Sequence, residues 1–237
     1  MVTLIPRVIH VAWKSKNLFD LDSIFLDNCI NNVLNLAQDW RCVLYDDVDI
    51  DKYLAENLEH SDYNLLKNSH IIEKCDVWRL LKLYNEGGLY VDIDRLCNTS
   101  LNSIIEPTTK VVLPTCKNLD FSQDFMLSAT KNPIFLKTLE LNLKRRFEGC
   151  KNLYFLGAQT YLHGIMLALL GEIIPQTEEN IIEIRNIIKN VEFIQTYVEN
   201  PPYDTILFRQ AARPFDHEME KRKFYASQNV RHWTNEW

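Results

Sequence analysis

Hydrophobic positions recur with two different periods in the first part of the chain. Residues 4–13 and 40–45 are rich in side chains that favour strands, whereas residues 18–37 repeat apolar side chains near helical spacing. The acidic stretch 46–51 predicts a loop, and a further helix is expected after it. This part of the chain therefore predicts strands that alternate with helices.

The strongest pattern spans residues 69–94. Ser69 is expected to cap a helix whose apolar stripe runs to Tyr84, and Gly87-Gly88 are expected to end that helix. Residues 89–94 then alternate apolar and polar side chains with a period of two, which predicts a strand. A pair of glycines thus joins a helix directly to a strand.

The alternation of strands and helices continues more weakly toward the C-terminus. Strands are expected at residues 110–114, 125–129 and 191–196, and helices at residues 133–147, 159–170 and 178–189. No repeat, linker or low-complexity segment divides the sequence. Residues 1–237 are therefore expected to form one α/β domain with a layered sheet.

Composition and charge exclude several functions. The 237 residues are 46% hydrophobic, and 26 basic against 32 acidic residues give a net charge of −6, which argues against a basic surface for nucleic acid or anionic membrane. The longest apolar run, near residues 165–170, is far shorter than the roughly 20 residues of a membrane span. No signal-peptide pattern opens the chain, so a cytoplasmic location is expected. The six cysteines form no C-x-x-C pair, and we interpret them as buried thiols rather than zinc ligands or disulfides.

Two carboxylates stand at the end of the strand predicted over residues 89–94. Its alternation puts Tyr90, Asp92 and Asp94 on the face opposite Leu89, Val91 and Ile93. Two neighbouring carboxylates repel unless a cation lies near them, and oxygen ligands suit Mg²⁺ or Mn²⁺. A divalent ion held there could bridge to a diphosphate.

The D-x-D pattern by itself is weak, because it occurs four times. The pairs Asp20/Asp22, Asp47/Asp49 and Asp49/Asp51 fall in or beside expected turns or helix starts, where aspartate commonly caps or is solvated. The pair Asp92/Asp94 differs, because aspartate is depleted in strands and both residues interrupt an apolar strand. We therefore expect a functional role for this last pair only.

The preceding helix adds an ionic pair. Asp76 and Arg79 are three residues apart and so share one helix face. One interpretation is an exposed ion pair that contributes a few tenths of a kcal/mol, roughly what surface pairs are worth. The other is a pair that hydrogen-bonds the hydroxyl groups of a sugar, because the helix leads directly into the carboxylate strand.

Three ordered motifs carry a family resemblance. The block Cys75-Asp76-Val77-Trp78-Arg79, Leu83-Tyr84 and residues 87–94 resembles the S-D-x-x-R, L-Y-x-x-G-G-x-Y-x-D-x-D block of the DXD-containing sugar-transferase family. Residues 5–13 (IPRVIHVAW) and 232–237 (HWTNEW) are similar to the family's opening and closing segments. This family includes the yeast initiating α-1,6-mannosyltransferase and capsular polysaccharide glycosyltransferases, and it is related to the glucosylating domain of large clostridial toxins.

The resemblance implies a GT-A-type (Rossmann-like) glycosyltransferase fold, with a mixed central sheet flanked by helices. It also implies a retaining, metal-dependent transfer of a hexose from a nucleotide-diphosphate sugar to a glycan, lipid-linked or protein acceptor, with Mn²⁺ or Mg²⁺ as cofactor. A UDP-sugar is favoured as donor, because residues 10–13 are closest to the segment found in the UDP-glucose-using toxins.

The resemblance also implies roles for individual residues. Trp13 is expected to stack on the base of the donor, and Val11 to make backbone contacts with it. Asp76 and Arg79 are expected to hold the donor sugar, and Tyr90 and Asp92 to contact the donor. Asp94 is expected to bind the metal with His232 or Asn235, and Trp237 to pack at the phosphates. Asp76, Arg79, Asp92 and Asp94 are the expected catalytic set. The alternative for Trp13 and for the aromatic residues of the tail is packing in the core.

Several positions depart from the family pattern. Cys75 stands where serine is usual, Glu236 replaces the serine before the final tryptophan, and residues 122–124 and 157–158 also differ. The last two segments are expected near the sugar and the acceptor, so the acceptor cannot be transferred from relatives. Two other functions stay open: a nucleotide-sugar-binding module without efficient transfer, and a metal-dependent phosphoesterase.

Overall fold

The computed structural model describes residues 4–17, 39–93, 100–114, 121, 123–175, 177, 180, 183–184, 187, 194–197 and 226. The helix predicted over 18–37 and most of the helix predicted over 178–189 lie outside these residues. Within them, no helix combines the length and the apolar character needed to cross a membrane.

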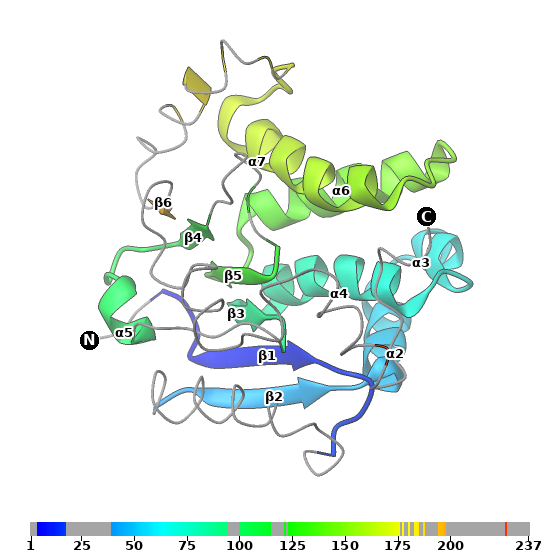
Figure 1. Ribbon diagram of the computed structural model, residues 1–237, viewed down its shortest axis with the longest axis horizontal. Helices are drawn as coiled ribbons and strands as arrows, with labels where there is room; N and C mark the ends of the chain where they lie inside the picture. Colours follow the sequence, from blue (N-terminus) through cyan, green and yellow to red (C-terminus); the bar gives the residue numbers. More distant parts are fainter. Residues whose placement is uncertain are drawn as a thin grey trace.

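In the described part of the chain, six strands form one mixed sheet (Figure 1). The strands are β1 (Val8–Ala12), β2 (Arg41–Tyr45), β3 (Gly88–Val91), β4 (Val111–Pro114), β5 (Phe125–Ser128) and β6 (Ile194–Tyr197), in the order β2-β1-β3-β5-β4-β6. β1 pairs in parallel with both β2 and β3, and β5 runs antiparallel to β3 and β4. The carboxyl ends of β1, β2 and β3 therefore share one edge, the place where open α/β sheets bind ligands.

Helices pack against this sheet and against one another. They are α2 (Asp47–Asn57), α3 (His60–Leu66), α4 (Ile71–Glu86), α5 (Leu101–Ile104), α6 (Pro133–Phe147) and α7 (Thr160–Leu170), and a π-helix, Phe155–Gln159, leads into α7. α6 lies between α4 and α7 (Figure 1). One buried cluster unites Trp78 of α4, Met126 of β5, Phe135 of α6 and Tyr161 of α7. The predicted mixed α/β architecture is confirmed.

Two predictions about helix starts are wrong. The acidic stretch 46–51 is not a loop: α2 begins at Asp47, and Asp46 forms a capping box in which its side chain accepts from the Asp49 amide while Asp49 accepts from the Asp46 amide. His70, rather than Ser69, caps α4, because its Nδ1 accepts from the Ile72 amide at 3.3 Å. Both errors come from local side-chain caps that the apolar spacing alone does not reveal.

The described cysteines, Cys42, Cys75 and Cys150, are free and partly buried. Burial raises the pKa of Cys42 and of Cys75, as expected of buried thiols.

The strand β3 is shorter than predicted. β3 ends at Val91 rather than at residue 94, and Asp92 follows it immediately. Asp94 lies outside the described residues.

The Gly87-Gly88 junction fixes β3 against β1. Gly88 has φ +93°, and a Cβ there would lie 2.5 Å from the Val8 carbonyl oxygen, so only glycine fits. The Gly87 carbonyl accepts a hydrogen bond from His10 Nε2 at 3.0 Å, which leaves His10 Nδ1 to accept from the Tyr45 hydroxyl at 3.1 Å. Burial lowers the pKa of His10 to about 4, so this side chain is a neutral link between β1, β2 and the end of α4.

Candidate functional site

Asp92 lies at the carboxyl edge of the sheet, directly after β3. The Tyr90 hydroxyl donates to Asp92 Oδ1 at 2.6 Å, and the Asp92 amide donates to the Asp124 carbonyl at 2.8 Å. The Asp92 side chain is 38% exposed, so part of the carboxylate is open to a ligand. Burial, with the Asp92 carboxylate, raises the pKa of Tyr90 well above its ordinary value, so Tyr90 stays a hydrogen-bond donor.

Helix α4 brings Asp76 and Arg79 to the same place. Arg79 Nη2 hydrogen-bonds Asp76 Oδ1, and Arg79 Nη1 lies 3.8 Å from Asp92 Oδ1. The side chains of Arg79 and Asp76 are only 11% and 21% exposed, so the interpretation as an exposed ion pair is wrong. A largely buried ion pair is costly to maintain, which makes it weak support for stability and favours another role.

Burial and charge set the protonation of this pair. Burial raises the pKa of Asp76, and the Arg79 guanidinium offsets part of that rise. Burial alone would lower the pKa of Arg79, but the negative groups around it, Asp76 first, raise that pKa above its ordinary value. Arg79 is therefore a permanent cation held between the two aspartates.

Gln123 completes the cluster, and sequence reasoning did not assign it a role. Arg79 donates from Nη2 to Gln123 Oε1 at 3.0 Å and from Nη1 to the Gln123 carbonyl at 3.1 Å, while Gln123 Nε2 donates to the Gly157 carbonyl at 3.2 Å. A Cβ on Gly157 would lie 3.8 Å from Asp76 Oδ2. The two segments that depart from the family pattern thus meet at the Asp76–Arg79 pair. The departure of these two segments from the family pattern was the sequence signal that could have pointed to Gln123.

The predicted base-binding residues lie on β1, next to β3. Trp13 follows β1, donates its amide to the Tyr45 carbonyl at 2.9 Å and is 8% exposed, and Val11 is buried within β1. Such burial is compatible with core packing and does not test stacking on a base. Asp94, His232, Asn235 and Trp237 lie outside the described residues, so the structure brings together Asp76, Arg79, Tyr90 and Asp92 of the predicted set.

The described residues supply part of a metal site at most. No group of three or more His, Cys, Asp or Glu side chains among them is arranged to hold an ion. The partly exposed Asp92 carboxylate is the hard oxygen donor that Mg²⁺ and Mn²⁺ prefer, and it stands two residues before Asp94. The oxygen ligands available at this edge of the sheet therefore fit a divalent cation.

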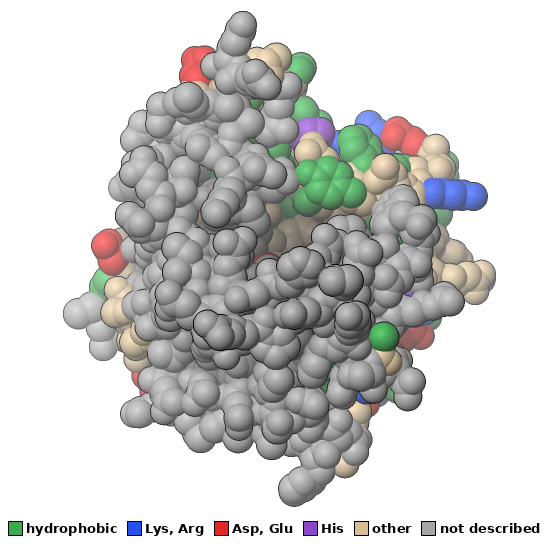
Figure 2. Space-filling view, viewed as in Figure 1, with side chains coloured by type: hydrophobic (Ala, Val, Ile, Leu, Met, Phe, Trp, Pro, Cys, Tyr) green, Lys and Arg blue, Asp and Glu red, His purple; other side chains and the backbone are tan. Residues whose placement is uncertain are grey.

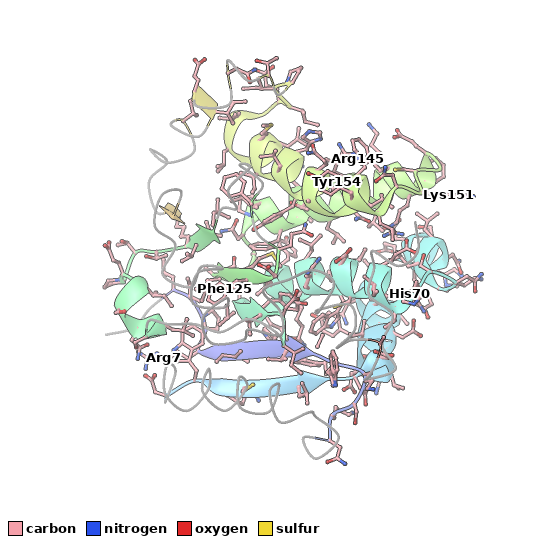
Figure 3. The ribbon with its side chains drawn as sticks, viewed as in Figure 1. Arg7, His70, Phe125, Arg145, Lys151 and Tyr154 are labelled. Atoms are coloured by element: carbon pink, nitrogen blue, oxygen red, sulfur yellow. The ribbon has the colours of Figure 1, made fainter. Side chains whose placement is uncertain are left out.

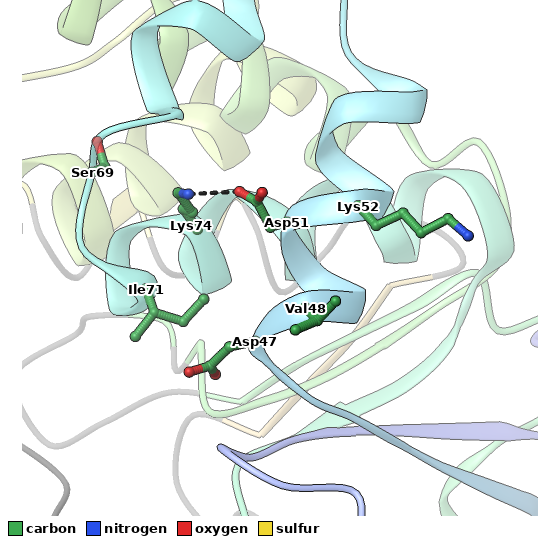
Figure 4. A pocket seen from close by; sticks show the side chains of 7 residues that line it. All are labelled: Asp47, Val48, Asp51, Lys52, Ser69, Ile71 and Lys74. Carbon is green, nitrogen blue, oxygen red and sulfur yellow. Dashed lines mark hydrogen bonds and ion pairs between the residues drawn. The ribbon is translucent and has the colours of Figure 1, made fainter.

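A separate pocket of about 420 Å³ lies between the starts of α2 and α4 (Figure 4). Its lining includes Asp47, Asp51 and Lys74, and Lys74 Nζ lies 2.6 Å from Asp51 Oδ1. Asp49, on the same helix, belongs to the capping box of α2. Asp49 and Asp51 thus have structural partners, as their sequence context predicted.

Chemically, the cluster offers both kinds of hydrogen-bonding group that a sugar needs. The Asp76 and Asp92 carboxylates accept hydrogen bonds from hydroxyl groups, and Arg79 is the fixed cation between them. Residues 25–110, which include this helix, the glycine pair and the Asp92 strand, match the sequence model described as "Glycosyltransferase sugar-binding region containing DXD motif". The match covers little more than a third of the chain, and this part of the chain is similar to the sugar-binding region of the DXD-containing glycosyltransferases. The resemblance inferred from the motifs is therefore confirmed.

Curated proteins similar to this chain include enzymes of two yeasts. Inositol phosphoceramide mannosyltransferase 1 of Schizosaccharomyces pombe is 27% identical over 57% of this chain and 42% of its own length. Mannosyl phosphorylinositol ceramide synthase SUR1 of Saccharomyces cerevisiae is 26% identical over 58% of this chain and 34% of its own length. The chain thus spans less than half the length of these two relatives.

A solved structure supports the fold of this chain. The PaToxG glycosyltransferase matches with a TM-score of 0.56 at 19% identity, over 95% of this chain and 85% of that one. At this identity the likeness concerns the fold alone. It confirms the predicted GT-A-type glycosyltransferase fold.

Proposed function

We propose that this chain is a retaining, metal-dependent glycosyltransferase that moves a hexose from a nucleotide-diphosphate sugar to a hydroxyl acceptor. The observation that carries the proposal is the buried Asp76–Arg79 pair, held by Gln123 beside Asp92 at the carboxyl edge of the sheet. These residues lie in or next to the segment that matches the sugar-binding region.

In the proposed reaction, the bond between the anomeric carbon and the diphosphate breaks and a bond to the acceptor oxygen forms on the same face. The acceptor proton passes to a phosphate oxygen of the leaving group. Asp76 and Asp92 accept hydrogen bonds from the donor's hydroxyl groups, and Arg79 fixes both carboxylates, so orientation accounts for much of the rate. No described carboxylate is needed as a covalent nucleophile.

The proposed metal site uses Asp94 with His232 or Asn235. Mn²⁺ or Mg²⁺ bound there would stabilise the charge that develops on the leaving diphosphate. Trp237 is proposed to pack at the phosphates. Addition of EDTA is expected to stop turnover, and excess Mn²⁺ to restore it.

The proposed donor is a UDP-sugar, with the base stacked on Trp13 and contacted by the backbone of Val11. This choice rests on the likeness of residues 10–13 to the UDP-glucose-using toxins. The names of the yeast relatives, by contrast, specify mannose as their sugar and inositol phosphoceramide as their acceptor. Mannose therefore belongs among the donor sugars tested, and a phosphorylated polyol among the acceptors. The cytoplasmic location stays a prediction from the sequence.

One incubation separates this proposal from its rivals. The protein is mixed with Mn²⁺ and UDP-glucose, UDP-galactose or GDP-mannose, and free sugar and transfer products are measured. Sugar release or transfer supports the transferase. Binding of a donor without turnover would indicate a nucleotide-sugar-binding module, and cleavage of p-nitrophenyl phosphate without sugar release would indicate a phosphoesterase.

A further inference from the structure

Arg145 of α6 is a buried cation whose hydrogen-bond partners in the described part of the chain are all neutral. It is 8% exposed, and it donates from Nη1 to Thr160 Oγ1 at 2.6 Å and to the Phe155 carbonyl at 3.3 Å. Its Nη2 donates to His163 Nδ1 at 2.5 Å. The buried Arg79 and Arg146, by contrast, each pair with a carboxylate. A buried guanidinium that bonds only neutral groups is costly; burial lowers the pKa of Arg145, and the nearby Glu148 carboxylate offsets part of that fall.

Aromatic and imidazole groups lie at the surface above this cation. The Arg145 guanidinium carbon lies 4.0 Å from the centre of the Phe155 ring, and Phe155 and Tyr154 are 38% and 46% exposed. Figure 3 labels Arg145, which lies on α6, and Tyr154, which directly precedes the π-helix. Hydrophobic and histidine side chains gather over these helices on the face seen in Figure 2. This group, Arg145, Tyr154, Phe155 and His163, is called the Arg145 patch below.

His163 gives the patch a second donor. Because Arg145 donates to Nδ1, the neutral imidazole carries its proton on Nε2. The ring is partly exposed and crosses the Phe155 ring edge-on at 6.3 Å. An N–H group next to a guanidinium suits an anionic oxygen.

The patch is continuous with the proposed donor site through one short element. Phe155 and Gly157 belong to the same five-residue π-helix, a form that often occurs at functional sites. Phe155 contacts Arg145, whereas Gly157 accepts from Gln123 and borders Asp76. The same short element thus borders both the patch and the proposed donor site.

We propose that the Arg145 patch is an acceptor subsite that selects a hydroxylated acceptor carrying an anionic group, phosphate or carboxylate. Arg145 and His163 Nε2 bind the anionic oxygens, and the exposed faces of Tyr154 and Phe155 cover the apolar side of the acceptor ring. This inference rests on the proposed function, because it names the second substrate of the same transfer.

The test is an NMR titration of the full chain with histidine rings labelled, so it does not require turnover. The probes are myo-inositol 1-phosphate and glucuronic acid, each against its uncharged counterpart, myo-inositol and glucose. We expect the His163 signal to shift saturably with at least one charged probe. The affinity for that probe should be at least about ten-fold lower in Arg145→Gln. Lys144→Gln makes the same charge change on the same helix at an exposed position and should bind normally.

A further variant protects the test against a folding defect. Tyr154→Ala changes a surface side chain that is 46% exposed, and it should weaken binding of the charged probe, read from the same His163 signal. No His163 shift with either charged probe, or equal shifts with charged and uncharged probes, would overturn the subsite. Absence of donor hydrolysis in the unaltered protein would instead count against the proposed function, whatever the titration gives.

Discussion

The Tyr90 hydroxyl donates a 2.6 Å hydrogen bond to Oδ1 of Asp92, two residues further along the chain. The bond orients a carboxylate that follows the end of β3, and Arg79 lies 3.8 Å from the same oxygen. The buried ring of Tyr90 thus holds the exposed carboxylate in one orientation.

The Tyr90→Phe substitution tests this relationship. The ring keeps its core packing, but the hydrogen bond to a charged partner is lost, so kcat/KM for donor turnover should fall about 10- to 100-fold. Tyr63→Phe is the matched control, because Tyr63 also donates to an aspartate, Asp51, at 3.1 Å on another helix. Equal rates for the two variants would show that Asp92 needs no orientation by Tyr90.

The shape of the Arg79 guanidinium is predicted to matter as much as its charge. Arg79→Lys keeps the positive charge but loses the guanidinium fork, the planar group whose Nη2 bonds both Asp76 and Gln123. The Asp76 and Gln123 side chains should then be misplaced, and kcat/KM should fall by at least about 100-fold. Arg146→Lys alters another buried ion pair, with Glu73, and should reduce stability while leaving turnover of the folded protein unchanged. Near-normal activity of Arg79→Lys would contradict the role given to the fork.

Much of the fold was predictable because local signals marked it. Asn132 caps α6 and Pro133 begins it, so the helix was predicted over the residues observed. Gly87-Gly88 likewise marked the junction of α4 and β3. The caps formed by Asp46 and His70 were missed, because a cap depends on side-chain geometry that spacing does not encode.

The part of the site that lies within one sequence block was predictable from local signals. Asp76, Arg79, Tyr90 and Asp92 stand within one sequence block, so their proximity follows from a helix, a glycine turn and a strand. Gln123 joins Arg79 across 44 positions from a segment without regular structure, and no local pattern announces such a contact. The buried cation at Arg145 was missed for the same reason, because its partners come from the following π-helix and α7.

Trp13 offers a prediction that separates base stacking from core packing. Loss of a stacked indole should raise the dissociation constant of the donor about 5- to 150-fold in Trp13→Ala. Trp40, 6% exposed and at the amino end of β2, is the control, and Trp40→Ala should lose stability without a change in donor affinity. If Trp13→Ala loses about 3–5 kcal/mol of stability and binds the donor normally, Trp13 is a core residue.

His10 predicts how stability depends on pH. Its pKa is about 4 in the folded protein and 6.5 when unfolded, so below pH 6.5 the unfolded chain takes up a proton that the folded chain does not. Stability is fully present above pH 6.5 and should fall by up to about 3 kcal/mol between pH 6.5 and 4. Urea unfolding at pH 7.5 and 4.5 measures the change. A similar loss in His10→Gln would assign the effect to other groups.

The central claim, that the Asp76–Arg79–Asp92 cluster binds the donor sugar, is tested most directly by comparing two aspartates with similar neighbours. Asp92 accepts from Tyr90 and lies near Arg79; Asp51 accepts from Tyr63 and pairs with Lys74, on the other side of α4. Donor hydrolysis in the presence of Mn²⁺ is measured for Asp92→Asn and Asp51→Asn, with folding checked by thermal melting. The account predicts a loss of at least about 100-fold for Asp92→Asn and a rate within about two-fold of the unaltered protein for Asp51→Asn. Equal rates for the two folded variants would contradict it.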